Sequence, residues 1–246
     1  MNYYGISDIG LVRKSNQDCY SITENEHGNL LAVVCDGVGG GQSGDVASKS
    51  AAHFFNNEFL KSPVFNDVTE VKTWINEALS RTNDFVLTLA ATKTKYHGMG
   101  TTLVAALQCP IGTFIANIGD SRAYRFQDGQ LFGLTKDHTL VEALVAQGVI
   151  TEAETFNHPQ RHVLTNAIGI EQTLLVDLFT VTEPYQLLLL CSDGLHGYLA
   201  DNEINELIPN RGKLQLIARH LIDRANAKGG FDNTTVVLIG AADFYE

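Results

Sequence analysis

Several common features are scarce in this 246-residue sequence, and each scarcity excludes a class of protein. There are only four cysteines, with no CxxC pair among them, which disfavours both a disulfide framework and a zinc site built on sulfur. The five prolines form no linker, and the longest apolar runs, such as 187–191, are too short to cross a bilayer. No basic-then-apolar leader is present near Asp8. We therefore expect a cytoplasmic protein without a membrane partner.

Positive charge is also scarce. The chain has 17 lysines and arginines against 28 acidic residues, for a net charge of -11. A nucleic-acid partner is disfavoured, because such binding needs a basic face that displaces counterions from phosphates. A negative balance can serve solubility alone. It also suits a protein that gathers carboxylates around cations.

The order of expected elements favours an α+β fold. Strands come in adjacent groups joined by short turns rather than alternating with helices, which favours antiparallel sheets with helices packed outside. We expect one domain over residues 1–246, with strands from both ends of the chain sharing a core. Two amphipathic helices are expected after the N-terminal strands, because apolar residues recur there at helical spacing. The apolar face of the second helix would contain Val71, Trp74, Ile75, Ala78, Leu79, Phe85, Val86 and Leu89. Strands are expected at 3–6, 19–24, 30–35, 101–108, 113–118, 123–127, 130–134, 174–180, 186–191 and 234–239.

Four aspartates stand at the ends of apolar strands. Asp36 and Asp193 each close such a strand and precede a glycine, and Asp120 follows Gly119. Asp232 lies just before the last strand. Carboxylates beside backbone that can approach closely are what hard cations such as Mg²⁺ and Mn²⁺ require. Singly, each aspartate is better read as a turn or cap residue, but as a set they favour a metal site.

An Asp-Gly pair is also the common two-residue hairpin turn. Asp128-Gly129 lies between two short strands and is read as such a turn. The segments that follow the other two Asp-Gly pairs do not read as returning strands. A glycine-rich stretch follows Gly37, and a segment of helical character follows Gly194. These pairs are therefore not simple hairpins.

Arg13 stands five residues before Asp18 near the N-terminus. An arginine beside a metal cluster suits phosphate, because its planar guanidinium can bind two oxygens at once. On this segment alone, a surface arginine in a loop is the better reading.

Eight segments follow one another along the chain: GLVRKSNQD, VVCDGVGGG, GMGTTLVAA, IANIGDSRAYR, LTKDHT, HPQRHVLTNAIG, LLLLCSDGL and DNTTVV. Taken together, these motifs resemble those of the type 2C, metal-dependent (PPM) protein phosphatases, most closely the compact bacterial members. The resemblance covers nearly the whole chain, from about Gly10 to Val237, and the motifs follow the family's order. It implies two antiparallel β-sheets packed as a central sandwich flanked by α-helices, with a small flap at about 138–161 that helps to choose substrates.

The resemblance also implies roles for individual residues. Two core ions, Mn²⁺ or Mg²⁺, are expected, and a third, weaker ion would lie between Asp120 and Asp193. Asp18 would orient the attacking water, and Arg13 would bind the substrate phosphate. Thr101 and Thr102 match a family motif without a chemical role assigned to them. The core ligands would be Asp36, Asp193 and Asp232 for the first ion, and Asp36 with the carbonyl of Gly37 for the second.

The implied reaction is hydrolysis of phosphoserine and phosphothreonine in proteins. A metal-bridging water would attack phosphorus directly, without a phosphoenzyme. The expected substrates are phosphorylated proteins, including a serine/threonine kinase or its targets, and the expected state is a monomer. The choice between Mn²⁺ and Mg²⁺ stays open.

Two positions depart from the family pattern. Many relatives have a histidine where this chain has Val38, so the general acid is open: a metal-bound water or another histidine, with His138, His158 and His162 as candidates. Many relatives have a glutamate where this chain has Gln17, which predicts weaker affinity for the second ion.

Three other functions compete with this one. A catalytically silent phosphoprotein-binding scaffold is disfavoured because all four strand-end aspartates are present. A phosphatase for small metabolites is not excluded by the sequence. A plain cation-binding module is disfavoured because it has no use for Arg13.

Overall fold

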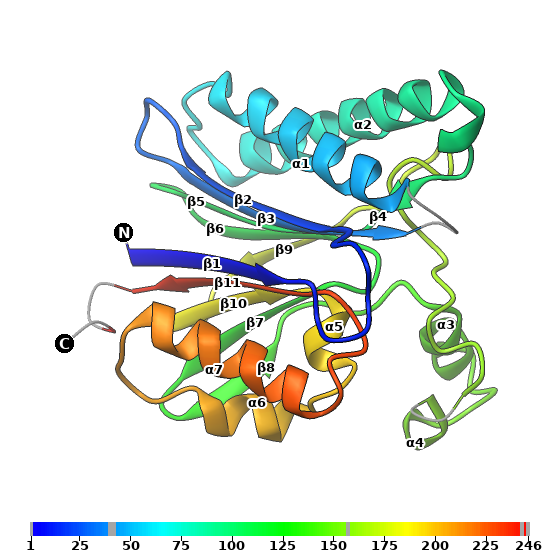
Figure 1. The fold of residues 1–246 in the computed structure, drawn as a ribbon. Helices are drawn as coiled ribbons and strands as arrows, with labels where there is room; N and C mark the ends of the chain where they lie inside the picture. Colours follow the sequence, from blue (N-terminus) through cyan, green and yellow to red (C-terminus); the bar gives the residue numbers. More distant parts are fainter. Residues whose placement is uncertain (1, 39–42, 156–157, 242–243, 245–246) are drawn as a thin grey trace.

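The computed structural model describes residues 2–38, 43–155, 158–241 and 244 of the chain. Two antiparallel sheets pack face to face between two layers of helices (Figure 1). The first sheet has the order β1-β11-β10-β7-β8, and the second the order β2-β3-β5-β6-β9 with the short β4 paired to β3. The strands are β1 Asn2–Asp8, β2 Asp18–Glu24, β3 Leu30–Val38, β4 Gly100–Thr101, β5 Leu103–Cys109, β6 Gly112–Ile118, β7 Arg122–Gln127, β8 Gln130–Gly133, β9 Asp177–Val181, β10 Leu187–Cys191 and β11 Thr234–Gly240.

The helices cover the outer faces of the two sheets (Figure 1). Helices α1 Gly44–Leu60 and α2 Val68–Ala91 pack on the second sheet. Helices α5 Asp193–His196, α6 Asp201–Leu207 and α7 Leu214–Ala227 pack on the first. Helices α3 Leu140–Ala146 and α4 Glu152–Thr155 lie apart at one end of the sandwich, and η1 Thr94–Tyr96 follows α2. None of the helices described is long and apolar enough to span a membrane.

The alternation of side chains explains why the central strands are apolar throughout. In β3, Leu31, Val33 and Cys35 point toward the helices α1 and α2, whereas Leu30, Ala32 and Val34 point between the sheets. Strand β10 does the same for the other sheet, with Leu188 and Leu190 facing inward. A strand buried on both faces carries no polar alternation. The predicted α+β sandwich is therefore confirmed.

The two ends of the chain meet in the first sheet. Strand β1 pairs antiparallel with β11, with Tyr3 opposite Ile239. This register confirms that strands from both ends share a core. It also places the end of β1 beside the start of β11, where Asp8 lies opposite Thr234.

Several local expectations are corrected by the structure. Phe85 is 40% exposed rather than buried, because it stacks on Phe54 of α1 at 4.6 Å between ring centroids. The strand expected at 101–108 is interrupted at Thr102, and β9 begins at Asp177 rather than at Leu174. The hairpin at Asp128 and Gly129 is confirmed, with φ of 51° and 77°. Residues 39–42 of the glycine-rich stretch and residues 156–157 of the expected flap lie outside the described part of the chain.

Candidate active site

The aspartates singled out in the sequence come together at one end of the sandwich. Asp18 and Asp36 face each other across β2 and β3. Asp36 interacts electrostatically with Asp18, Asp193 and Asp120, and Asp193 interacts with Asp232. Segments from the whole length of the chain therefore contribute to one acidic centre.

Arg13 lies at the edge of this centre. Its Nη2 donates to Asp232 Oδ2 at 2.6 Å, and its Nε donates to the carbonyl of Phe231 at 3.3 Å. Burial opposes the charge of the guanidinium, but Asp232 and its acidic neighbours outweigh burial and raise the pKa of Arg13. The arginine is a permanent cation placed beside the carboxylates.

Asn233 holds the loop that carries Arg13, a role that the sequence analysis missed. Its side chain is buried, and its Nδ2 donates to the carbonyls of Ile9 at 2.9 Å and Ser15 at 3.0 Å. Its Oδ1 accepts from the backbone of Gln17 at 2.8 Å. One amide thus uses donor and acceptor groups to fix both sides of the loop.

The backbone at Asp36 is fixed by the two threonines of the GMGTT motif. The Asp36 carbonyl accepts from the Thr102 backbone and from Thr101 Oγ1, both at 2.8 Å. The Asp36 N–H donates to Thr102 Oγ1 at 3.0 Å. Gly37 follows, and a side chain there would collide with the carbonyl of Gly44 at the start of α1. The threonines therefore hold the strand in place rather than supply chemistry.

Asp18 is held by two hydroxyl groups. Its Oδ2 accepts from Ser192 Oγ at 2.6 Å and from Thr235 Oγ1 at 2.7 Å. Its Oδ1 is buried and has no hydrogen-bond partner among the described residues. Burial raises the pKa of Asp18 to about 7, against the opposing effect of the two hydroxyls. Ser192 and Thr235 were not predicted from the sequence.

The other carboxylates are also held in conditions that disfavour their charge. Burial, followed by repulsion from neighbouring aspartates, raises the pKa of Asp36 and Asp120 well above the usual range. Burial and then Asp232 raise the pKa of Asp193, whose Oδ1 is buried without a partner in the described chain. Asp36 and Asp193 also influence each other's protonation, so a cation between them would favour the charged form of both.

This donor set fits a hard divalent cation, since it consists of carboxylate oxygens that need positive charge. In the described part of the chain, no three carboxylate, histidine or cysteine groups already converge as a complete ligand set. The fit therefore rests on the chemistry of the donors and on the partnerless oxygens of Asp18 and Asp193.

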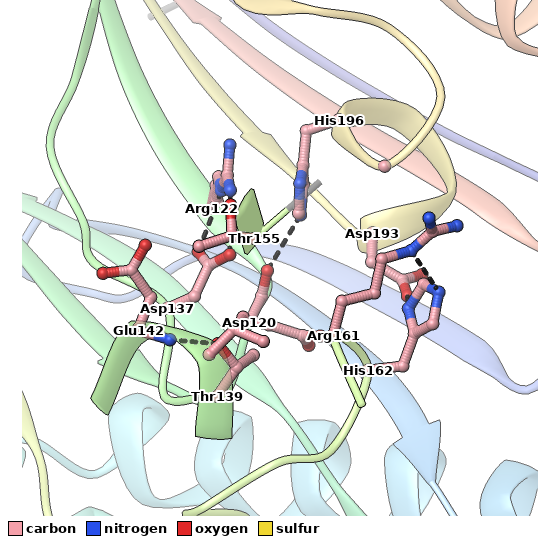
Figure 2. Close-up of a pocket in the computed structure, with 12 residues that line it drawn as sticks. Asp120, Arg122, Asp137, Thr139, Glu142, Thr155, Arg161, His162, Asp193 and His196 are labelled. Atoms are coloured by element: carbon pink, nitrogen blue, oxygen red, sulfur yellow. Dashed lines mark hydrogen bonds and ion pairs between the residues drawn. The ribbon is translucent and has the colours of Figure 1, made fainter. Parts of the chain in front are cut away.

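A cavity of about 130 Å³ opens beside Asp120 and Asp193 and is also lined by Val141 and Glu142 of α3. Figure 2 shows residues that line this cavity. Its base contains a two-pronged ion pair between Arg122 and Asp137, with both N–O distances 2.8 Å. His196 donates from Nε2 to the carbonyl of Asp120 at 2.8 Å, and burial lowers its pKa to about 3, so it stays neutral. The residues around Asp120 are thus rigidly supported.

The structure separates the three histidine candidates. His138 is buried; its Nδ1 lies 2.8 Å from Asn166 and its Nε2 lies 3.2 Å from Asp177, so its role is structural. Among the described residues, His158 makes hydrogen bonds within its own turn, where its Nδ1 accepts from the Gln160 N–H at 3.2 Å. His162 lines the cavity, with Nδ1 4.0 Å from Asp193 Oδ2. Of these three histidines, His162 is the one that the described structure places beside the candidate metal-binding aspartates.

Known proteins are similar to this chain in sequence and in fold. The family model described as Protein phosphatase 2C matches residues 12–233. The chain is 36% identical to the serine/threonine phosphatase stp of Listeria welshimeri, over 95% of this chain and 93% of that protein. The crystal structure of the serine/threonine phosphatase Stp1 from Staphylococcus aureus superposes with a TM-score of 0.91 at 34% identity, covering 97% and 94% of the two chains.

A second solved structure is similar over the whole chain. The PPM Ser-Thr phosphatase MsPP from Mycobacterium smegmatis, in complex with cacodylate, has a TM-score of 0.83 at 33% identity and covers 98% of this chain and 99% of that one. The chain therefore belongs to the protein phosphatase 2C family and is a protein serine/threonine phosphatase.

Proposed function

We propose that the chain hydrolyses phosphoserine and phosphothreonine in proteins at the acidic centre, with Mn²⁺ or Mg²⁺ as its cofactor. The observation that carries this proposal is the gathering of buried carboxylates with raised pKa beside the cation of Arg13. Such carboxylates need a cation, and the arginine suits a phosphate. Both requirements are met by a phosphate ester bound to divalent ions.

The ligands that we propose are those that the family resemblance implies. Asp36, Asp193 and Asp232 would hold one ion, and Asp36 with the Gly37 carbonyl a second. Asp120 and Asp193 would hold a third and weaker one. When bound, such ions acidify water and neutralise the charge that develops on the phosphate oxygens.

The chain's own residues bind and orient the reactants. Arg13 binds the phosphate through its guanidinium. Asp18 Oδ1, which lacks a partner among the described residues, is the oxygen available to hold the attacking water. Direct attack by water is further supported by Cys35 and Cys191. Burial raises the pKa of both thiols, so neither supplies a thiolate for a phosphoenzyme.

The relatives support the substrate class. Their names specify serine/threonine phosphatases, and the solved structure of MsPP holds cacodylate, a tetrahedral oxyanion like phosphate. We extend this to a monomeric enzyme whose substrates include a serine/threonine kinase or its targets. Sedimentation of the purified protein and phosphate release from an autophosphorylated kinase test these two extensions.

The first test is phosphate release from a phosphothreonine peptide, with Mn²⁺, with Mg²⁺ and with chelator, for wild type and Asp193→Asn. We expect release that depends on metal and is abolished by the substitution. Asp128→Asn in the β7–β8 turn is the matched control, because asparagine also tolerates its φ of 51°. If folded wild type releases no phosphate with either metal, the proposal is contradicted. Faster release from a sugar phosphate than from the peptide would also contradict it.

A further inference from the structure

An exposed apolar surface lies directly beside Arg13. It consists of Leu11 and Val12 in the loop before β2, and Phe231 in the segment before β11, which are 70%, 58% and 52% exposed. The ring of Phe231 packs against Tyr198 at 5.7 Å between centroids. We call this set the Arg13 apolar surface. Exposed apolar residues scattered singly need no explanation, but several brought together mark a binding surface.

The backbone under this surface is fixed. The Gly230 carbonyl accepts from the N–H of Leu11 at 2.7 Å and of Val12 at 3.2 Å. Gly230 has a φ of 54°, and a side chain there would press against Leu11. The Phe231 carbonyl accepts from Arg13 Nε. Hydrogen bonds therefore fix the backbone beneath these exposed side chains.

The surface lies within reach of the residues that flank a bound phosphoamino acid. Leu11 and Val12 precede Arg13 by two and one positions, and consecutive Cα atoms are about 3.8 Å apart. An extended peptide advances by about 3.3 Å per residue, so the residues next to the phosphorylated one cover a similar distance. A phosphate held by Arg13 therefore brings the neighbouring side chains of the substrate over this surface.

We propose that the Arg13 apolar surface binds an apolar side chain of the phosphoprotein, close to the phosphorylated residue, and so selects substrates. The inference rests on the proposed function of Arg13 as the phosphate ligand. The occupant is the substrate chain itself, because the surface is continuous with the site where that chain must lie. A leucine, isoleucine or phenylalanine side chain of the substrate would be shielded from water by packing against Leu11, Val12 and Phe231.

The test compares phosphothreonine peptides that carry either leucine or serine at each of the two positions on either side of the phosphothreonine. The quantity measured is the ratio of kcat/KM for the leucine peptide to that for the serine peptide. For wild type we expect a ratio of roughly ten at one or more of these positions. Leu11→Ser and Val12→Ser are expected to reduce the ratio toward one, mainly through KM. Val12→Ile is expected to retain it.

Leu216→Ser is the matched control, because Leu216 is 57% exposed on α7. It is expected to leave the ratio unchanged. A wild-type ratio near one at all four positions would overturn the inference, as would an equal loss in the control. Wild type that releases no phosphate from any peptide would overturn the proposed function instead. Sedimentation of wild type and Leu11→Ser completes the test, since a dimer lost on substitution would identify the surface as a contact between copies of the chain.

Discussion

Arg13 and Asp232, 219 positions apart in the sequence, are joined by a hydrogen bond of 2.6 Å between Nη2 and Oδ2. The proposed phosphate ligand thus contacts a proposed metal ligand. Binding of a cation to Asp232 and of a phosphate to Arg13 would each replace one partner of this pair. The two binding events are therefore expected to favour each other.

Replacing Arg13 tests this relationship. Arg13→Ala is expected to reduce kcat/KM for a phosphothreonine peptide by roughly ten- to a hundredfold, the contribution typical of hydrogen bonds to a charged group. Arg13→Lys is expected to recover only part of the loss, because lysine is a point charge without the planar fork. Steady-state kinetics at saturating metal measures both. Full activity in Arg13→Lys would contradict two-oxygen binding of the phosphate.

Asn233 is expected to matter because it fixes the loop that carries Arg13. Asn233→Ala removes three hydrogen bonds, which lowers the free energy of unfolding by about 2–3 kcal/mol and raises KM. Asn76→Ala on α2, which removes one exposed hydrogen bond, is the control. In an Arg13→Ala background, Asn233→Ala should raise KM little further. Fully additive effects would show that Asn233 does not act through Arg13.

The raised pKa of Asp18 predicts a pH dependence of stability in chelator. An unfolded aspartate has a pKa of about 3.9, whereas the folded pKa is about 7. The folded state therefore binds the proton more tightly, and its stability falls as the pH rises from about 4 to 7. Asp18→Asn should reduce this slope. The lowered pKa of His196 contributes a slope of the opposite sign. Because His196 is present in both proteins, its contribution cancels when their slopes are compared. Denaturant unfolding at pH 5 and pH 7.5 measures it, and equal slopes would contradict the assignment.

The aspartates of the candidate site could be picked out of the sequence only as a set, because a single Asp beside a glycine is equally well a turn or cap residue. Asp36 and Asp193 each follow a strand buried on both faces, and several such aspartates together favour a cation site. Arg13 and Asp18 came only from the resemblance, since nothing local separates them from surface residues. Asn233, Ser192 and Thr235 were missed because their partners lie far away in sequence. The hydrogen bond from the Thr235 backbone to Ser192 Oγ exists only because β10 and β11 pair in one register.

The same reasoning explains the error at Phe85. Its spacing fits the buried face of α2, but a second aromatic residue, Phe54 on α1, gives it a partner at the surface. Stacking shields much of the apolar surface of both rings from water, although the pair lies outside the core. The spacing of apolar residues within one helix cannot reveal such a partner, because the partner belongs to another helix.

Gln17 remains a prediction about metal affinity. Its backbone is fixed, since its carbonyl accepts from Ser48 Oγ at 2.5 Å and from the Gly37 N–H at 3.1 Å. A substitution therefore changes the side chain without displacing the loop. Gln17→Glu adds a negative charge next to the strand that carries Asp36 and is expected to tighten binding of the second ion. Calorimetric titration with Mn²⁺ measures this, and an unchanged isotherm would remove the hypothesis.

His162 is the histidine whose position suits proton donation to the leaving alkoxide. Its Nε2 accepts from Arg161 Nε at 2.9 Å, so the neutral ring carries its proton on Nδ1, the atom 4.0 Å from Asp193. His162→Gln is expected to lower kcat for a phosphothreonine peptide about a hundredfold, the lower range for general acid catalysis.

Its effect on p-nitrophenyl phosphate should be small, because that leaving group departs without a proton. This contrast separates proton donation from a loss of metal or substrate binding, which would slow both substrates. His158→Gln, in the same segment but without a contact to the carboxylates among the described residues, is the matched control. Equal slowing of both substrates in His162→Gln would return the role of general acid to a water molecule.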